Sequence, residues 1–225
     1  MIDRSVAGEV TRRRLSYLSP DKFDSLYDCM EKVQMLQIAG DFVEFGVALG
    51  GSGICLAKAL TGNRRYVGFD VFGMIPPPSA ADGKEVHARY KVIASGQSTG
   101  IGGNQYYGYV ANLYEVVKNN FLSFGCEVDN KQIVLIKGLF YETLSHHDQL
   151  TIALAHLDCD WYEPVLFCLN YVWPRLATDG FIVIDDYNDW AGCKKATDKF
   201  ISLQKNLEPV RYRPHAVLRK TAERG

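Results

Sequence analysis

The sequence predicts an α/β protein built on a Rossmann-like, doubly wound and mostly parallel sheet, with helices on both faces and a terminal antiparallel strand pair. Two observations carry this prediction. Short apolar runs of strand length alternate with longer segments of helical periodicity, and a glycine-rich turn follows the first of these runs. Alternating strands and helices form parallel sheets, because each crossover helix packs on a face of the sheet.

The bulk composition is that of one globular domain over residues 1–225. Hydrophobic residues make up 47% and charged residues 23% of the chain, and 25 basic residues nearly balance 26 acidic ones. This balance argues against nucleic acid as the main partner. No apolar run approaches the ~18 residues that span a bilayer, so we expect no membrane partner, and without a signal peptide we expect a cytoplasmic location. Six scattered cysteines without a C-x-x-C pair indicate reduced thiols rather than a zinc site.

The N-terminal segment 1–40 is expected to be helical, and the first strand–helix–strand unit follows it. A helix over 21–39 should end at Gly40, and the tract Arg12 to Arg14 is interpreted as a solvated turn or a helix start. Next come, in order, a strand over 42–45, a helix over 54–60 and a strand over 65–69 that leads into Asp70.

Residues 73–108 interrupt this alternation. The prolines at 76–78 exclude a helix at that point, and the stretch from Gly96 to Gly108 is rich in glycine and holds paired tyrosines. A segment of this length without clear periodicity is typical of a lid or a mobile loop, so we expect a lid-like insertion over about 73–108. The three tyrosines at 106, 107 and 109 fit an aromatic wall for a ring-shaped ligand and simple loop packing equally well.

The alternation resumes after the insertion. The expected elements are a helix near 110–124, strands over 132–137 and 152–157, a helix over 162–173, a strand over 181–184, a helix near 191–205 and a strand pair within 210–219. Ligands of such sheets bind beyond the carboxyl ends of the strands. The residues that stand at those ends are Glu44, Gly46, Asp70, Gly138, Asp158, Asp160, Asp185 and Asp186.

The glycine-rich turn from Gly46 to Gly53 favours S-adenosylmethionine (SAM) over a dinucleotide. Glycines let peptide N–H groups approach a ligand at the start of the helix, but Ala48 breaks the spacing of a NAD fingerprint. Glu44, two residues before the first glycine, suits a ligand with an ammonium or sulfonium group. Asp70 stands where a nucleotide ribose is held. The alternatives are a purely structural glycine turn and an aspartate that caps a helix or turn.

Four aspartates terminate two strands that are expected to be buried. Asp158 and Asp160 follow one strand, and Asp185 and Asp186 follow the next. Neighbouring parallel strands lie ~5 Å apart, so these carboxylates converge and repel one another unless a proton or a cation lies between them. An all-oxygen set suits Mg²⁺ first, with Mn²⁺ or Ca²⁺ as alternatives, and such an ion lowers the pKa of a bound hydroxyl. The alternative is that the second pair merely caps a loop.

Six blocks of the sequence match one known family. The blocks are Glu44–Ser52, Asp70–Pro76, Asn112-Leu113 with Glu115-Val116, Lys137–Leu144, Leu157–Glu163 and Ile184–Tyr187. On these blocks the chain resembles the macrocin O-methyltransferase family from about Asp41 to Ala196. This family consists of metal-dependent class I methyltransferases that methylate sugar or phenol hydroxyls of macrolides and related natural products. The chain departs from the family at Ala48-Leu49, where a Trp-Arg pair is usual, and at Cys159, where glycine is usual.

The resemblance implies a SAM-dependent O-methyltransferase with a bound divalent metal and a small-molecule hydroxyl acceptor, either a sugar or a phenol. It makes Asp160, Asp185 and Asp186 the metal ligands, and Asp160 is also the residue that accepts or steers the hydroxyl proton. The SAM-binding residues that it implies are Glu44, Gly46, Gly50, Ser52, Asp70, Gly138, Leu139 and Asp158. A homodimer is the default expectation for such an enzyme.

Two other functions stay open. A NAD(P)-dependent oxidoreductase is disfavoured by the glycine spacing and by the lack of a Tyr-x-x-x-Lys pair. A SAM-binding partner protein without catalytic activity is disfavoured by the four aspartates, but the departures at Ala48-Leu49 and Cys159 keep it open. A requirement for a divalent metal would separate these two functions from the methyltransferase.

Overall fold

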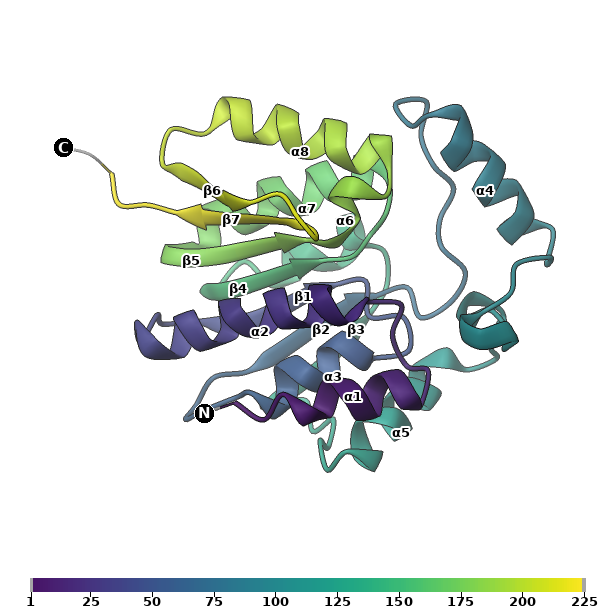
Figure 1. Ribbon diagram of the computed structural model, residues 1–225, viewed down its shortest axis with the longest axis horizontal. Helices are drawn as coiled ribbons and strands as arrows, with labels where there is room; N and C mark the ends of the chain where they lie inside the picture. The colour runs from purple at the N-terminus through teal and green to yellow at the C-terminus, as the bar shows by residue number, and fades with distance from the viewer. Residues whose placement is uncertain (1, 224–225) are drawn as a thin grey trace.

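The computed structural model describes residues 2–223, and in this range seven strands form one mixed sheet in the order β3-β2-β1-β4-β5-β7-β6 (Figure 1). The strands are β1 (Asp41–Phe45), β2 (Tyr66–Asp70), β3 (Ile133–Lys137), β4 (Ile152–Leu157), β5 (Leu176–Ile184), β6 (Leu207–Arg211) and β7 (Ala216–Lys220). The first five run parallel, whereas β7 runs antiparallel to both β5 and β6. The predicted fold class, including the terminal antiparallel pair, is confirmed.

Helices cover both faces of this sheet. They are α1 (Ser5–Arg12), α2 (Pro20–Met35), α3 (Gly51–Lys58), α4 (Lys84–Ala94), α5 (Leu113–Ser123), α6 (Phe140–Thr143), α7 (Tyr162–Arg175) and α8 (Ala191–Leu203). One hydrophobic core joins the sheet to α1, α2, α3 and α5, and a second core joins it to α7 and α8. None of the helices within residues 2–223 is both long enough and apolar enough to cross a bilayer.

The central strands β1 and β4 are buried along their whole length. Strands that are covered on both faces read as continuous apolar runs, which is why the sequence predicts them well. The two strands are neighbours, and the chain leaves β1 toward β2 on one side and β4 toward β5 on the other. A crevice opens where the strand order reverses in this way, so the carboxyl ends of β1 and β4 mark the expected ligand position.

The N-terminal segment departs from expectation at the end of its second helix. Helix α2 ends at Met35 rather than near Gly40, because Gln37 already adopts the left-handed conformation (φ +53°) that ends a helix. The tract Arg12 to Arg14 is exposed, closes α1 and forms the turn after it, so of its two interpretations the solvated turn is confirmed and the helix start is not.

The segment 73–108 holds a helix that the sequence analysis did not predict. Helix α4 buries only Val86 and Ile93 of its residues, too few for a visible apolar face. In Figure 1 it stands apart from the rest of the helices, beyond the edge to which the parallel strands point. The expected insertion is therefore a folded segment, and whether it opens and closes as a lid stays a prediction.

Candidate functional site at the carboxyl edge of the sheet

Two adjoining cavities lie at the carboxyl ends of the parallel strands. The first, here called the glycine-turn cavity, has a volume of about 280 Å³ and extends toward Leu139, Phe140 and Phe167. The second, the acidic cavity, has a volume of about 270 Å³ and extends toward the residues of α2, α4 and the loop after β5. Both cavities are lined by Gly46, Asp70, Ile75, Tyr107, Asp158, Asp160 and Trp161.

Gly46 lies where the ends of β1 and β4 touch. Its φ angle is +93°, and a Cβ atom at this position would lie 1.8 Å from the carbonyl oxygen of Asp158. The Asp158 N–H in turn donates to the carbonyl oxygen of Phe45 at 2.8 Å. Only glycine fits this close approach, so the first glycine of the turn is required by the backbone whatever the ligand.

Asp70 fixes the conformation of the glycine turn. Its Oδ2 accepts hydrogen bonds from the backbone N–H groups of Val47 (2.7 Å) and Ala48 (3.0 Å), and its Oδ1 accepts one from Phe72 (2.6 Å). Burial raises the pKa of Asp70, although these three bonds oppose the rise. Each carboxylate oxygen has a further lone pair, so the predicted ribose contact stays compatible with this arrangement.

Glu44 lies beneath the turn and lines neither of the two cavities. Its side chain is fully buried, its Oε1 is 2.9 Å from His156 Nδ1, and its other oxygen accepts from the hydroxyl of Tyr66. A Cβ atom on Gly53 would lie 2.7 Å from this carboxylate, so the group faces α3. A direct contact between Glu44 and a ligand stays a prediction that the cavity linings do not support.

Of the remaining residues predicted to bind SAM, one lines a cavity and three do not. Leu139 lines the glycine-turn cavity, directly after Gly138, whose φ angle of +150° suits glycine. Gly50 is the N-cap of α3 in the left-handed conformation, and Ser52 is buried in the first turn of that helix. Gly50, Ser52 and Gly138 shape the backbone around the cavities without lining them.

Three carboxylates converge at the floor of the acidic cavity. One oxygen from each of Asp158, Asp185 and Asp186 lies within 4.8 Å of the others. This group, here called the carboxylate triad, shares two members with the predicted ligand set and holds Asp158 where that set has Asp160. Asp160 lies beside it: its backbone N–H donates to Asp186 Oδ2 at 3.0 Å, and its Oδ1 accepts from the indole N–H of Trp190 at 3.0 Å.

The charges of these carboxylates are balanced unequally. Burial, followed by repulsion from the neighbouring carboxylates, raises the pKa of Asp158 and of Asp186 well above the usual range. Burial also raises the pKa of Asp160 to about 6, against the hydrogen bond from Trp190. Burial acts on Asp185 as well, but its bond with His215 and the charges of His156 and Lys22 lower its pKa to about 2. The triad therefore gathers more negative charge than its surroundings neutralise.

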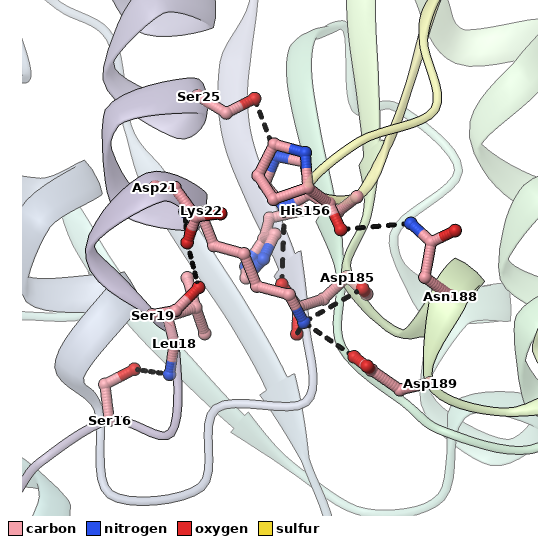
Figure 2. Close-up of polar contacts among 12 residues, drawn as sticks. Ser16, Leu18, Ser19, Asp21, Lys22, Ser25, His156, Asp185, Asn188 and Asp189 are labelled. Carbon is pink, nitrogen blue, oxygen red and sulfur yellow. Dashed lines mark hydrogen bonds and ion pairs between the residues drawn. The ribbon is translucent and has the colours of Figure 1, made fainter.

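The partners of Asp185 come from distant parts of the chain, as Figure 2 shows for the α2 side. Lys22 Nζ lies 2.8 Å from Asp185 Oδ2 and 2.7 Å from Asp189 Oδ2. His215 Nδ1 lies 3.3 Å from Asp185 Oδ1, and its Nε2 lies 2.9 Å from Ser25 Oγ. Sequence reasoning missed both Lys22 and His215, because neither belongs to a motif.

Aromatic side chains wall the cavities. The rings of Trp161 and Trp190 pack edge to face at 5.6 Å, and the indole N–H of Trp161 donates to the carbonyl oxygen of Pro76. The three tyrosines fitted either a ligand wall or loop packing. Tyr106 and Tyr107 line the acidic cavity, whereas the hydroxyl of Tyr109 forms hydrogen bonds with the backbone of its own segment. Trp161 belongs to a matched sequence block, but no sequence signal marked Trp190.

The sheet order, the glycine turn after β1 and the cavities at the carboxyl edge define a Rossmann-like α/β protein of the class I methyltransferase type. Within that class, the chain belongs to the macrocin O-methyltransferase family, whose model, described as Macrocin-O-methyltransferase (TylF), matches residues 3–212.

Several characterised proteins are similar to this chain. The 8-demethyl-8-(2,3-dimethoxy-alpha-L-rhamnosyl)-tetracenomycin-C 4'-O-methyltransferase of Streptomyces olivaceus is 32% identical over 171 residues, covering 74% of this chain and 60% of its own length. The demethyldecarbamoylnovobiocin O-methyltransferase of Streptomyces niveus is 27% identical over 188 residues, covering 80% and 64%. The structure of the O-methyltransferase NovP superposes with a TM-score of 0.71 at 25% identity, covering 89% of this chain and 79% of its own. The chain thus spans less than two thirds of the length of either curated relative.

Proposed function

We propose that the protein transfers a methyl group from SAM to a hydroxyl of a sugar or another small natural product, assisted by a divalent cation. The observation that carries this proposal is the position of the carboxylate triad, which adjoins the glycine-turn cavity through the shared residues Asp158 and Asp160. A donor and an activated hydroxyl held in these neighbouring cavities would meet with their reacting atoms side by side. The names of the curated relatives, two O-methyltransferases of natural products, support the same chemistry.

The donor is assigned to the glycine-turn cavity. SAM carries an electrophilic methyl group on its sulfonium sulfur. When the methyl group is transferred, the C–S bond breaks and S-adenosylhomocysteine (SAH) is the leaving group. Gly46 admits the ligand to the backbone at the end of β1, Asp70 offers an acceptor for the ribose hydroxyls, and Leu139 with Phe140 forms an apolar wall for the adenine. The backbone itself brings Gly46 close to Asp158 and holds the turn on Asp70, so this half of the site does not need a ligand to take its shape.

The residues of the triad fit a hard divalent cation. Their donor atoms are all carboxylate oxygens within 4.8 Å of one another, and burial together with mutual repulsion raises the pKa of Asp158 and Asp186, as expected where a positive charge is needed. We assign the cation to Asp158, Asp185 and Asp186, with Mg²⁺ first and Mn²⁺ or Ca²⁺ as alternatives. A bound cation would supply Lewis acidity, which lowers the pKa of a coordinated acceptor hydroxyl.

Asp160 is assigned the hydroxyl proton rather than a place among the ligands. One of its oxygens accepts from Trp190, and the residue lines both cavities between the donor and the triad. In a regular strand the side chains of Asp158 and Asp160 would point to the same face. The φ angle of +55° at Asp160 takes its backbone out of the strand conformation, so this rule does not hold for the pair. A carboxylate at this place can accept the proton of the attacking hydroxyl while Trp190 holds its orientation.

The acceptor is assigned to the acidic cavity. Tyr107, Trp161 and Trp190 offer flat surfaces that suit the apolar face of a sugar ring or an aryl ring. Arg89 and Ile93 of α4 complete the wall on the far side. The choice between a sugar and a phenol hydroxyl, the homodimer and the cytoplasmic location stay predictions.

The first test is calorimetric titration with SAH, with and without Mg²⁺, on the wild type and on Asp70→Ala. We expect micromolar binding to the wild type and its loss in the variant, followed by metal-dependent turnover in a screen of glycosides and phenols. Absence of SAH binding together with binding of NADP⁺ would replace the proposal by the oxidoreductase. SAH binding without turnover of any acceptor, with or without Mg²⁺, would favour the non-catalytic partner protein.

A further inference from the structure

Lys22 places an ammonium group against the carboxylate triad. Its Nζ donates to Asp185 Oδ2 at 2.8 Å and to the Asp185 carbonyl oxygen at 3.2 Å, and also to Asp189 Oδ2 at 2.7 Å (Figure 2). The side chain is only 14% exposed. Two carboxylates therefore face this ammonium group at hydrogen-bond distance.

We propose that Lys22 is a built-in counter-ion of the cation site, which competes with the divalent cation for Asp185 and lowers its affinity. This inference rests on the assignment of the triad under the proposed function. An ammonium group at this distance repels a divalent cation bound to the same carboxylate, and it occupies one of the lone pairs that the Asp185 oxygen could offer as a ligand. Binding of the divalent cation therefore requires Lys22 to release Asp185.

Asp189 gives Lys22 a place to remain after that release. It lies on the solvent side of the pair, its side chain is 50% exposed, and it does not belong to the triad. Lys22 can keep its 2.7 Å contact with Asp189 while it gives up Asp185, so the exchange does not leave a buried ammonium group unpaired. The two contacts of Lys22 thus serve different states of the site.

Asp185 differs from the other members of the triad in this respect. Both of its oxygens have partners in the described residues, Lys22 on one and His215 on the other. Asp186 accepts a backbone N–H from Asp160, and no hydrogen bond to the Asp158 carboxylate is present within residues 2–223. Lys22 therefore competes with the cation at one ligand, Asp185. Lys22 belongs to α2, whereas the members of the triad stand at the ends of β4 and β5.

Binding of Mn²⁺, followed by the electron paramagnetic resonance signal of the free ion, tests this inference on the whole chain. Lys22→Met removes the charge and keeps much of the side-chain length, so we expect it to tighten Mn²⁺ binding about tenfold. Lys22→Arg keeps the charge and should stay within about threefold of the wild type. Lys32→Met, which removes a lysine from the last turn of the same helix, should bind Mn²⁺ as the wild type does.

Thermal unfolding with and without MnCl₂ provides a second readout. Without the ion, Lys22→Met should unfold at a lower temperature than the wild type, because the triad loses its counter-charge. With saturating ion, its unfolding temperature should rise by more than that of the wild type, because a ligand that binds the folded state more tightly stabilises it more. A variant with reduced stability thus remains informative.

The outcomes separate the inference from the function on which it rests. If the wild type binds Mn²⁺ and Lys22→Met binds it equally or more weakly, Lys22 is not a competitor and the inference is overturned while the cation site stands. Binding only by Lys22→Met would support the inference in its strongest form. If neither protein binds Mn²⁺, the cation site and the inference both fail, whereas SAH titration still reports on the donor site independently.

Discussion

The two halves of the site hold a buried carboxylate in opposite ways. Asp70, at the glycine-turn cavity, is bound by three backbone N–H groups from the turn after β1 and from its own loop. Asp185, in the acidic cavity, is bound by side chains that come from α2 and from the residue before β7. Backbone donors are fixed by the fold, whereas charged side chains can exchange partners.

This difference separates a preformed half from a half that depends on charge. The glycine turn needs no ion to keep its shape, because neutral backbone N–H groups donate the hydrogen bonds that hold it on Asp70. The triad gathers like charges that Lys22 neutralises only in part, so its arrangement responds to any added cation. We therefore expect substitutions on one side to leave ligand binding on the other side nearly unchanged, except at the point where the two sides touch.

Gly46→Ala acts where the two halves touch and should have the largest effect. Its Cβ atom would lie 1.8 Å from the Asp158 carbonyl oxygen, and its φ angle of +93° is unfavourable for alanine. The ends of β1 and β4 would have to separate, so we expect a loss of about 3–4 kcal/mol in the free energy of unfolding. Urea denaturation measures it, and binding of both SAH and Mn²⁺ should fall in the same variant.

Gly62→Ala is the matched control for this substitution. Gly62 also has a positive φ angle of +60°, but a Cβ atom there would meet nothing within 4 Å. Only the backbone strain remains, about 1–2 kcal/mol. Equal losses in the two variants would mean that the contact with Asp158 does not determine the need for glycine.

Asp186→Asn should affect the acidic side alone. The substitution removes one charge and one ligand oxygen from the triad, so we expect Mn²⁺ affinity to fall at least about 100-fold. Affinity for SAH in the absence of the ion should stay within about twofold, because Asp186 does not line the glycine-turn cavity. Retention of Mn²⁺ affinity would contradict the assignment of the cation to the triad.

Much of the preformed half could be predicted from the sequence. The strands β1, β2 and β4 are short apolar runs because both faces are buried, and each of the motif residues Gly46 and Asp70 stands at a strand end. Asp70 lies at the end of β2 and bonds the turn after β1, so both partners stand at the ends of neighbouring strands that the apolar pattern already marks. The ribose role of Asp70 and the ligand role of Glu44 go beyond such local geometry and stay predictions.

The charged half could be predicted only in part. Asp158, Asp185 and Asp186 follow buried strands and were expected to converge. Asp160 adopts a left-handed conformation in the turn after β4, so the alternation of side chains along a strand does not predict which of Asp158 and Asp160 joins the triad. Lys22 lies 163 residues from Asp185 in the sequence. No periodicity links residues so far apart, and helix α4 was missed because its few buried side chains leave no apolar face.

Asp70→Asn should affect the glycine-turn side alone. The amide group keeps the size of the carboxylate but turns either an N–H₂ group or a weaker acceptor toward the backbone donors of Val47 and Ala48. We expect SAH affinity to fall about tenfold, because the turn to which we assign the donor loses its anchor. Mn²⁺ affinity should stay within about twofold, the reverse of the result for Asp186→Asn. A parallel loss of both affinities would show that the halves are not independent.

Trp190→Phe should have the smallest effect. It acts on Asp160, which lines both cavities. It removes the indole N–H that donates to Asp160 Oδ1 at 3.0 Å and keeps a ring next to Trp161. If Trp190 only orients the carboxylate that accepts the hydroxyl proton, kcat should fall about fivefold with an acceptor from the screen, while the affinities for SAH and Mn²⁺ stay unchanged. Trp173→Phe, at a ring that packs on Phe200 outside both cavities, should leave kcat as it is. A loss of Mn²⁺ affinity in Trp190→Phe would instead place Asp160 among the cation ligands, as the sequence first suggested, and would extend the charge-dependent half to include it.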